Sequence, residues 1–377
     1  MSQRNVLILL AAVVVLVTLM LVGQRSGGNG GGGKLFAPSL EAALNDVERV
    51  TITKANNEIV VALERKPEGW VAANKNGYPA DVSKLRQGLS ALAEAKILEQ
   101  KTANPELYSH LGVEDVSGEK AAGIAVALTA KGKDLSALIL GDADGTKHRY
   151  VRRVGDAQSY LIDRNPEFAR GVGQWLDAQI VDVRSDRIAQ VTITPPDGPV
   201  VRLSKPNTEA ATYDVADVPK GRELLYPGVA NVIGNSLREL NLEDVEPAAA
   251  SAPTKPTVVE FHTFDGLVVR AEGEKRGDAS WVSFTASVDS AQAARATAAA
   301  TATPPAQGAG APAGPPRSAA PPPAAPDPAA DAARINAKVG PWRYKIATFQ
   351  YDQMTRRLAD LLKPPPEPAT KRDPQTR

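Results

Sequence analysis

One alternating tetrapeptide occurs twice in this sequence and constrains the fold more than any other feature. Val50-Thr51-Ile52-Thr53 and Val191-Thr192-Ile193-Thr194 are identical, and they alternate apolar and hydroxyl side chains as a half-buried strand does. A turn and a second apolar run follow each one, at residues 59–64 and at residues 200–203. The recurrence indicates an internal duplication of a unit that begins with a β-hairpin.

Each hairpin is followed by a further strand and then by a helix. In the first copy the strand is centred on Trp70, and Asp81 is a suitable N-cap for the helix. In the second copy Tyr213 takes the place of Trp70. Apolar residues recur at helical spacing in both predicted helices: Val82, Leu85, Leu89 and Leu92 in the first, and Val229, Ile233, Leu237 and Leu240 in the second.

A third copy is predicted near the end of the chain. Its strands lie at residues 258–261, 267–271 and 281–284, and it resumes at 342–346 before a last helix capped by Asp352. Three copies in one order indicate duplicated hairpin/strand/helix modules.

Four further strands are predicted between the first two copies. They lie at residues 124–129, 135–140, 148–153 and 159–162, with turns at Asp144-Gly145 and Gly155-Asp156. A helix over residues 166–176 follows them. This pattern predicts a β-meander packed on a helix.

The apolar run at residues 6–22 contains no charge and no proline. As a helix it spans about 26 Å, which is the short end of the transmembrane range. It therefore predicts an anchor that contacts membrane lipid. A cleaved signal peptide is the competing interpretation, with a weak cleavage site at Ser26-Gly27-Gly28. Arg4 precedes the run and Arg25 follows it, so the positive-inside bias is slight, while the short head before the run favours an inside amino terminus.

These patterns predict an α+β protein with one N-terminal transmembrane helix followed by repeated antiparallel β-hairpin/strand/helix modules, with a β-meander in the first domain. We expect an inner-membrane, single-pass protein whose bulk lies in the periplasm or extracytoplasmic space. The predicted parts are a cytoplasmic head (1–5), the transmembrane helix (6–22), a Gly-rich tether (23–34), a first α+β module with the meander (35–185), a second module (186–250), a third module (251–285 and 336–363), a disordered Pro/Ala-rich insertion (286–335) and a disordered tail (364–377).

The composition excludes several chemistries. The chain has no cysteine, which removes disulfides, thiol catalysis and thiolate metal sites. A formal net charge of +1 gives no overall attraction to nucleic acid, so we expect no nucleic-acid partner. His110, His148 and His262 lie in different predicted modules without ligand spacing. We expect no catalytic residue, no metal site and no cofactor.

Two local features have a functional and a structural interpretation. The loop Gly141 to Lys147 resembles phosphate and calcium loops, but it lacks the spacing of the first and the closing Glu of the second, so a hairpin turn is favoured. Lys147, Arg149, Arg152 and Arg153 form a basic patch on the third meander strand. They are candidates for binding an acidic partner or an anionic glycan, while a solvated sheet face is the ordinary explanation.

Several stretches together resemble a known bacterial family. They are residues 47–52, the Trp70 strand with its following helix, 138–141 with Tyr150-Val151, 160–163, and 188–193. Their order is similar to the family catalogued as domain of unknown function forty-three forty, over about residues 35–247 and more loosely the third copy. The resemblance implies a membrane-anchored protein encoded near gliding-motility-type ABC transporters, and it carries over no catalytic residues. The Pro/Ala insertion departs from the family's pattern.

We therefore expect a membrane-anchored extracytoplasmic accessory protein of an ABC-type transport or gliding-motility-like system. It is expected to act by protein–protein binding, not as an enzyme, with an ABC-type permease or other envelope proteins as partners. The alternative is an envelope hydrolase or glycan-binding protein that uses a cleft between modules. A deep site with converging carboxylates or perturbed titratable groups favours the alternative, and shallow faces with exposed apolar side chains favour protein binding.

Overall fold

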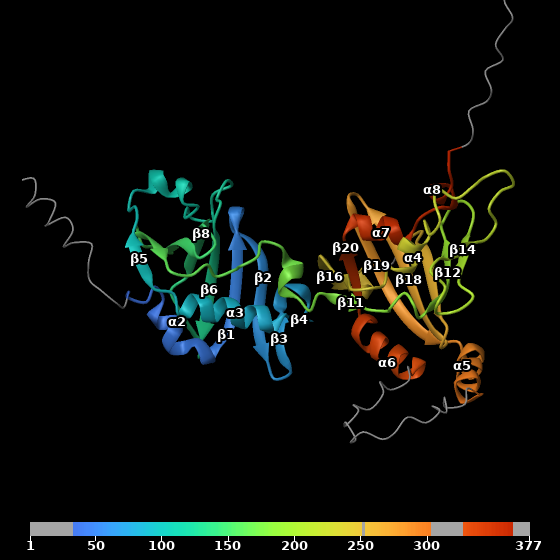
Figure 1. Ribbon diagram of the computed structural model, residues 1–377. Helices are drawn as coiled ribbons and strands as arrows, with labels where there is room; N and C mark the ends of the chain where they lie inside the picture. The colour runs from blue at the N-terminus through green and yellow to red at the C-terminus, as the bar shows by residue number, and fades with distance from the viewer. Residues whose placement is uncertain (1–32, 251–252, 303–326, 365–377) are drawn as a thin grey trace, which may run out of the picture. The chain divides into compact units, whose positions relative to one another are not determined.

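The computed structural model describes residues 33–250, 253–302 and 327–364, and they form two compact units. Unit 1 consists of the described residues up to Ile59 together with Leu85–Phe168, and unit 2 consists of Val60–Lys84 and the described residues from Ala169 onward. The division falls inside strand β2 (Glu58–Lys66) and inside helix α3 (Val82–Ala93), so both elements begin in one unit and end in the other. Figure 1 labels the elements along the chain.

Unit 1 is built on an antiparallel sheet. In spatial order its strands are β1 (Val47–Lys54), β6 (Ile124–Ala130), β8 (Leu138–Asp144), β9 (His148–Arg153), β10 (Ser159–Ile162) and β5 (Ile97–Gln100). On its other side β1 neighbours β2, and the two-residue β7 (Lys133–Asp134) pairs with β6. The short helical segments are α2 (Pro38–Ala43) and the 3₁₀ turns η1 (Leu44–Asp46), η2 (Ala55–Asn57) and η4 (Pro105–His110).

The patterning of apolar residues explains these elements. In β1 Val50 and Ile52 are buried on one face and alternate with less buried residues, and Val47 is buried beyond the register shift between Val47 and Arg49. In α3 Leu85, Leu89 and Leu92 are buried at helical spacing. Burying each such side chain contributes roughly 1.5–3 kcal/mol. The Asp81 carboxylate accepts a 3.0 Å hydrogen bond from the Lys84 N–H, which confirms the predicted N-cap.

Unit 2 contains an eight-stranded antiparallel sheet. In spatial order its strands are β14 (Asp214–Val215), β13 (Val201–Ser204), β12 (Ile188–Thr194), β17 (Thr257–Thr263), β18 (Leu267–Arg276), β19 (Ala279–Val288), β20 (Trp342–Ile346) and β16 (Asp244–Pro247). A smaller two-stranded ladder in the same unit joins β11 (Gln179–Val181) to β15 (Leu240–Asn241). Strands β2, β3 (Gly69–Ala72) and β4 (Tyr78–Pro79) pair in that order and are the end of the ten-stranded sheet that contains β1.

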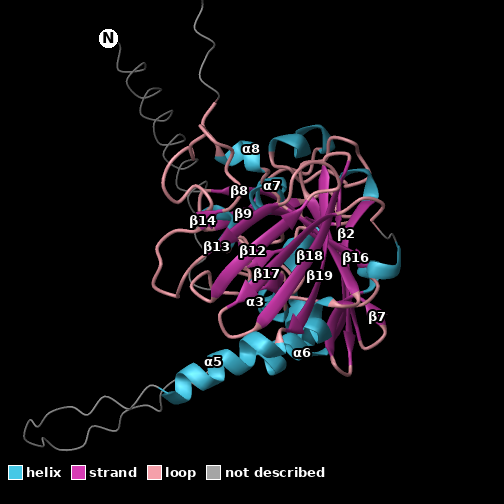
Figure 2. Ribbon diagram, turned by 90° about the vertical axis from the view of Figure 1, so that its right-hand side faces the viewer, coloured by secondary structure: helices cyan, strands magenta, loops and turns pink. Residues whose placement is uncertain are grey.

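The helical segments of unit 2 are short apart from one pair. They are η3 (Ala73–Lys75), η5 (Val172–Trp175), α4 (Asn231–Gly234), η6 (Ala248–Ala250), α5 (Ser290–Ala302), α6 (Pro328–Val339), α7 (Thr348–Met354) and α8 (Leu358–Leu361). The Asp327 carboxylate caps α6 by accepting from the N–H groups of Ala329 and Ala330. Helix α6 buries Ile335 and Val339 against the sheet, whereas Figure 2 shows α5 extending away from the strands.

The two sheets repeat one strand order. Read along each sheet, β1-β6-β8-β9-β10-β5 corresponds to β12-β17-β18-β19-β20-β16, and β2 and β3 correspond to β13 and β14. The register also repeats. The ladder of β1 with β6 shifts between Val47 and Arg49, and the ladder of β12 with β17 shifts between Ile188 and Gln190, which are the same positions relative to the shared tetrapeptide. The duplication is therefore a repetition of a whole sheet.

The α+β class predicted from the sequence is wrong, because the described residues form mainly antiparallel strands with short helices beside them. The expected succession of hairpin/strand/helix modules is replaced by the twofold repetition. Strands β17 to β20, whose pattern suggests a third copy, take the sheet positions of the meander strands β6, β8, β9 and β10. Alternation of apolar and polar residues with a period of two identifies a strand. It does not show which strand of the other repeat occupies the same position in its sheet. The predicted module boundaries themselves stay predictions.

Three predicted helices are also corrected. The stripe that begins at Val229 is fully buried, but only Asn231–Gly234 is helical, because Gly228 and Glu239 have positive φ angles of 79° and 50°. Of residues 166–176 only η5 is helical. The last helix is split into α7 and α8, and Asp352 lies inside α7 instead of capping it. Apolar spacing identified the burial correctly and the backbone conformation incorrectly.

Within the described residues, no helix combines the length and the apolar character that crossing a membrane requires. The run at residues 6–22 lies outside the described residues, so the transmembrane helix in the predicted fold class has no support from the structure. The head, almost all of the Gly-rich tether, the Pro/Ala-rich stretch at 303–326 and the tail from residue 365 lie outside them as well.

Candidate functional site

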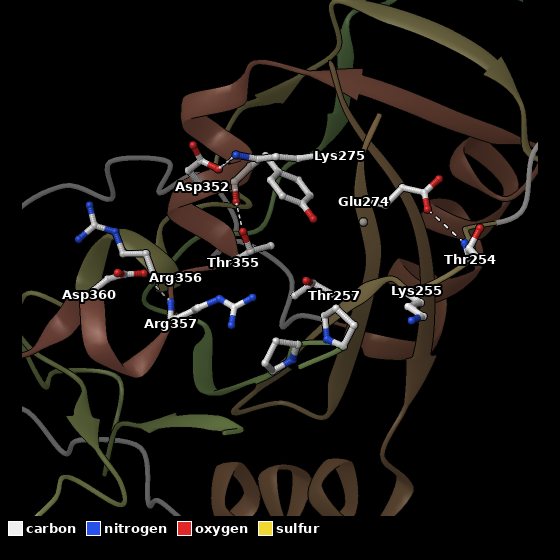
Figure 3. A pocket seen from close by; sticks show the side chains of 14 residues that line it. Thr254, Lys255, Thr257, Glu274, Lys275, Asp352, Thr355, Arg356, Arg357 and Asp360 are labelled. Atoms are coloured by element: carbon white, nitrogen blue, oxygen red, sulfur yellow. Dashed lines mark hydrogen bonds and ion pairs between the residues drawn. The ribbon is translucent and has the colours of Figure 1, made fainter. Parts of the chain in front are cut away.

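An open groove of about 970 Å³ lies in unit 2 beside helix α7, and we name it the α7 groove. Four segments line it, namely Pro195-Pro196 after β12, residues 254–257 at the start of β17, residues 273–275 of β18, and residues within 351–360 from α7 and α8. Figure 3 shows these side chains around the groove.

Local sequence places these segments. Strand β12 ends at Thr194 because Pro195 and Pro196 have no N–H to donate to a ladder. Gly273 lies in the middle of β18 where the Tyr351 ring of α7 packs on the sheet. A Cβ atom at position 273 would lie 2.5 Å from that ring, so only glycine permits this approach of helix to strand.

Glu274 is the most constrained carboxylate of the α7 groove. It accepts hydrogen bonds from the Thr254 N–H at 3.1 Å and from Arg276 Nε at 2.8 Å, and it pairs with Arg343 Nη2 at 3.1 Å. Burial by itself would raise the pKa of Glu274, but the hydrogen bonds from Arg276 and Thr254 and the charge of Arg343 outweigh it, so the pKa is lowered. Arg276 also reaches Glu246 at 2.8 Å. Glu274 is therefore held as an anion within an ion-pair network.

The other two carboxylates that line the groove also have partners. Asp352 pairs with Lys275 at 2.6 Å, and the Asp360 carboxylate accepts from the Arg357 N–H at 3.0 Å as a cap of α8. Figure 3 draws both contacts. The Arg357 guanidinium binds Asp197 at 2.8 Å, and this hydrogen bond lowers the pKa of Asp197.

Two basic side chains of the groove are not paired. Among the described residues, neither Lys255 nor Arg356 has a hydrogen-bond or ion-pair partner, and Lys255 is exposed. The Tyr351 ring is buried, which raises the pKa of its hydroxyl, while a hydrogen bond with Thr257 acts in the opposite direction. The groove thus offers two cations without a hydrogen-bond or ion-pair partner among the described residues, although the charge of Lys255 also helps to lower the pKa of Asp197.

The basic residues predicted on the meander strand lie in unit 1 and do not form one surface. Arg152 is 3% exposed, and it donates to the Val113 and Asp156 carbonyl oxygens at 2.8 and 2.9 Å and to Asp115 at 2.6 Å. Arg149 donates to Asn165 at 2.7 Å and to the Gly141 carbonyl.

The remaining two predicted residues differ from each other. Arg153 donates to the Phe36 carbonyl oxygen and lies over the Phe36 and Tyr160 rings. Lys147 is exposed in the turn between β8 and β9. Three of the four side chains therefore tie loops and strands together, and a binding role for the four stays a prediction.

The loop Gly141 to Lys147 is the hairpin turn between β8 and β9, as the favoured interpretation predicts. Gly145 has a φ of +67°, which turn glycines tolerate. Gly141 is needed for packing, because a Cβ there would lie 2.2 Å from the Leu111 carbonyl oxygen.

Sequence reasoning missed the groove as a whole. Its lining comes from four segments spread over residues 195–360, and no motif joins them. Phe349, the most exposed large apolar side chain among the described residues at 64%, was missed too. It lies on α7, three residues before Asp352. An aromatic residue that belongs to no apolar stripe is the only signal in the sequence.

The fold and the site define a mainly antiparallel β protein with a duplicated sheet and an open, polar groove in its second unit. The profile of the family described as Domain of unknown function (DUF4340) matches residues 70–257 of the chain. The predicted resemblance is thereby confirmed. The match runs from β3 to the start of β17, so it includes Pro195, Pro196 and residues 254–257 of the α7 groove but not α7 itself. No curated protein and no solved structure matches the chain.

Proposed function

We propose that this protein is a non-enzymatic accessory protein of an ABC-type transport or gliding-motility-like system. In this proposal it works on the extracytoplasmic side of a bacterial inner membrane and binds protein partners, foremost the permease subunit. The family resemblance supplies the context of the proposal, and the surface beside the α7 groove supplies its physical basis.

The observation that carries the proposal is the exposure of Phe349. Its side chain is 64% exposed on α7, and Asp352, one helical turn further on, lines the α7 groove. Leaving a phenylalanine in water forgoes roughly 1.5–3 kcal/mol of burial. Aromatic and arginine side chains dominate the binding energy of protein interfaces, and Phe349 and Arg356 together provide both types.

The alternative, an envelope hydrolase, would in its glycosidase form need a carboxyl group that keeps its proton near neutral pH as the general acid. The α7 groove is built in the opposite way, because the pKa of Glu274 is lowered and Asp352 and Asp360 already have partners. Recognition is therefore the better-supported function.

The test is site-specific photocrosslinking in the native cell. A photoreactive phenylalanine analogue replaces Phe349 in the full chain, and the matched control places it at Val154 of unit 1, which is 46% exposed. We expect an adduct from position 349 that contains an ABC-type permease subunit, identified by mass spectrometry, and none from position 154. Failure to find a permease adduct at position 349, with normal protein levels, contradicts the proposal.

A further inference from the structure

The carboxylates that line the α7 groove have hydrogen-bond or ion-pair partners, but two of its basic side chains have none within the described part of the chain. Glu274 pairs with Arg276 and Asp352 pairs with Lys275, whereas the Asp360 carboxylate accepts from the backbone N–H of Arg357. Lys255 and Arg356 have no such partner among the described residues. Four basic side chains line the groove against three carboxylates, and two of the four have no ion-pair partner among the described residues, so the groove favours a negatively charged occupant.

The two free cations do not converge on one point. Figure 3 shows Arg356 on the α7 side of the groove and Lys255 on the opposite side, with Thr257 and Arg357 between them. One compact anion cannot engage both ends of such a site. A chain with carboxylates spaced along it can, because each carboxylate meets its own cation, and the arginine can hold its carboxylate through two parallel hydrogen bonds.

The shape of the groove agrees with an extended chain. Its volume of about 970 Å³ exceeds what a single carboxylate needs, and it is open instead of enclosed. Pro195-Pro196 give it a rigid apolar wall, and the exposed Phe349 lies one helical turn from Asp352. A segment that alternates acidic and apolar residues satisfies the cations and covers the apolar surface.

We propose that the α7 groove binds an acidic, extended segment of a partner protein, with Lys255 and Arg356 as the residues that recognise its carboxylates. This inference rests on the proposed protein-binding function and adds to it the chemistry of the partner.

The experiment uses the full chain and a defined probe. The probe is a fluorescein-labelled peptide of alternating Glu and Leu, and its neutral counterpart has Gln in place of Glu. Binding is measured by fluorescence anisotropy at low salt. The test variant is Lys255→Glu with Arg356→Glu. The matched control is Lys120→Glu with Lys133→Glu, which makes the same charge change at two exposed lysines of unit 1.

We expect the wild-type chain to bind the acidic peptide at least about tenfold more tightly than the neutral one, which corresponds to about 1.4 kcal/mol. The Lys255/Arg356 variant loses this preference, and the unit 1 control keeps it. Three results overturn the inference: equal binding of both peptides, unchanged binding by the Lys255/Arg356 variant, or displacement of the peptide by phosphatidylglycerol vesicles or by a second copy of the chain.

The two proposals fail separately. If the adduct between position 349 and a permease persists in the Lys255/Arg356 variant, the acidic-segment inference is wrong and the accessory function stands. If the acidic peptide binds as expected but position 349 gives no permease adduct, the accessory function is wrong and the chemistry of the groove stands.

Discussion

Unit 1 and unit 2 have sheets with the same strand order, but one face of the sheet is buried in unit 1 and the equivalent face is exposed to solvent in unit 2. Equivalent rows can be read across the strands from the register. In unit 1 the row Thr53, Ala125, Ile139, Arg152 crosses β1, β6, β8 and β9, and in unit 2 the row Thr194, Val258, Glu272, Ser283 crosses β12, β17, β18 and β19. Ile139 is 0% exposed, whereas the side chain of Glu272 is 37% exposed.

A single connection accounts for the difference. In unit 1 the chain between β5 and β6 runs over residues 101–123, and its Tyr108, Val113 and Val116 pack on Ala125 and Ile139 to form a second core. In unit 2 the equivalent chain between β16 and β17 covers only residues 248–256. There the same face carries Arg270, which pairs with Glu260 at 2.7 Å and with Glu272 at 2.9 Å.

The comparison shows how a duplicated sheet can divide its tasks. One copy has its second face covered by its own chain and becomes a scaffold. The other copy leaves that face to solvent, as antiparallel sheets can. The unit with the short connection is also the unit that contains the α7 groove and Phe349.

The sharpest way to break the comparison is to exchange equivalent residues. Ile139→Glu places a charge within the second core of unit 1. We expect it to lower the free energy of unfolding of that unit by about 4 kcal/mol or more, because the charge has no partner there. Glu272→Ile is expected to change stability by less than about 1 kcal/mol, because it removes only a half-exposed ion pair. Hydrogen exchange resolved by residue reads each unit separately. If Ile139→Glu and Glu272→Ile lowered the free energy of unfolding by similar amounts, the assignment of covered and open faces would be refuted.

The next largest effect is expected at Arg152. Replacement by alanine leaves the Val113 carbonyl without its donor and removes the contact with the Tyr108 ring, so we expect about 3 kcal/mol of destabilisation confined to unit 1. Lys147→Ala, at an exposed position of the same predicted patch, is expected to leave exchange unchanged. An Arg152→Ala protein with normal exchange at residues 108–116 would show that this arginine is not a structural tie.

Gly273→Ala tests how closely α7 approaches the sheet. The added methyl group would meet the Tyr351 ring, so we expect about 1–3 kcal/mol of destabilisation and weaker binding of the acidic peptide. Gly118→Ala is the control, because its methyl group would lie at an ordinary 3.6 Å from the nearest atom. Thermal unfolding and peptide anisotropy measure the two effects, and equal unfolding curves for both variants would contradict the packing described for the groove.

The smallest expected effect concerns acid. The pKa of Glu274 is lowered in the folded protein from an ordinary value of 4.5, so its contribution to stability is complete above about pH 4.5 and is lost as the pH falls through the lower folded value. Glu274→Gln should therefore flatten the acid limb of the stability curve of unit 2 below that pH. If the stability of the Glu274→Gln variant fell as steeply with decreasing pH as that of the wild type, other carboxylates would be responsible for the loss of stability in acid.

The sequence contains much of the fold and little of the site. Alternation located β1 and β12, the shared tetrapeptide revealed the duplication, and Asp81 marked the start of α3. The wrong repeat number arose because the equivalence of strands is a property of sheet order, which long-range pairing decides. The helix predicted at Val229 failed because a buried stripe does not require helical backbone.

The α7 groove was beyond prediction for a physical reason. Lys255 and Arg356 are ordinary surface cations in the sequence, and only the absence of ion-pair partners among the described residues distinguishes them from Lys275 and Arg357. That absence depends on where four distant segments meet. The predicted basic patch shows the converse. In the sequence Arg152 and Arg153 resemble solvent-exposed charges, but in the fold both donate hydrogen bonds to backbone carbonyl oxygens.

Hydrogen exchange of the full chain with and without the acidic Glu/Leu peptide tests most directly whether unit 2 is the recognising unit. We predict that the peptide slows exchange at residues 254–257 and 348–360 and leaves residues 101–130 of unit 1 unchanged. Slower exchange at residues 101–130, with none around α7, would contradict the account.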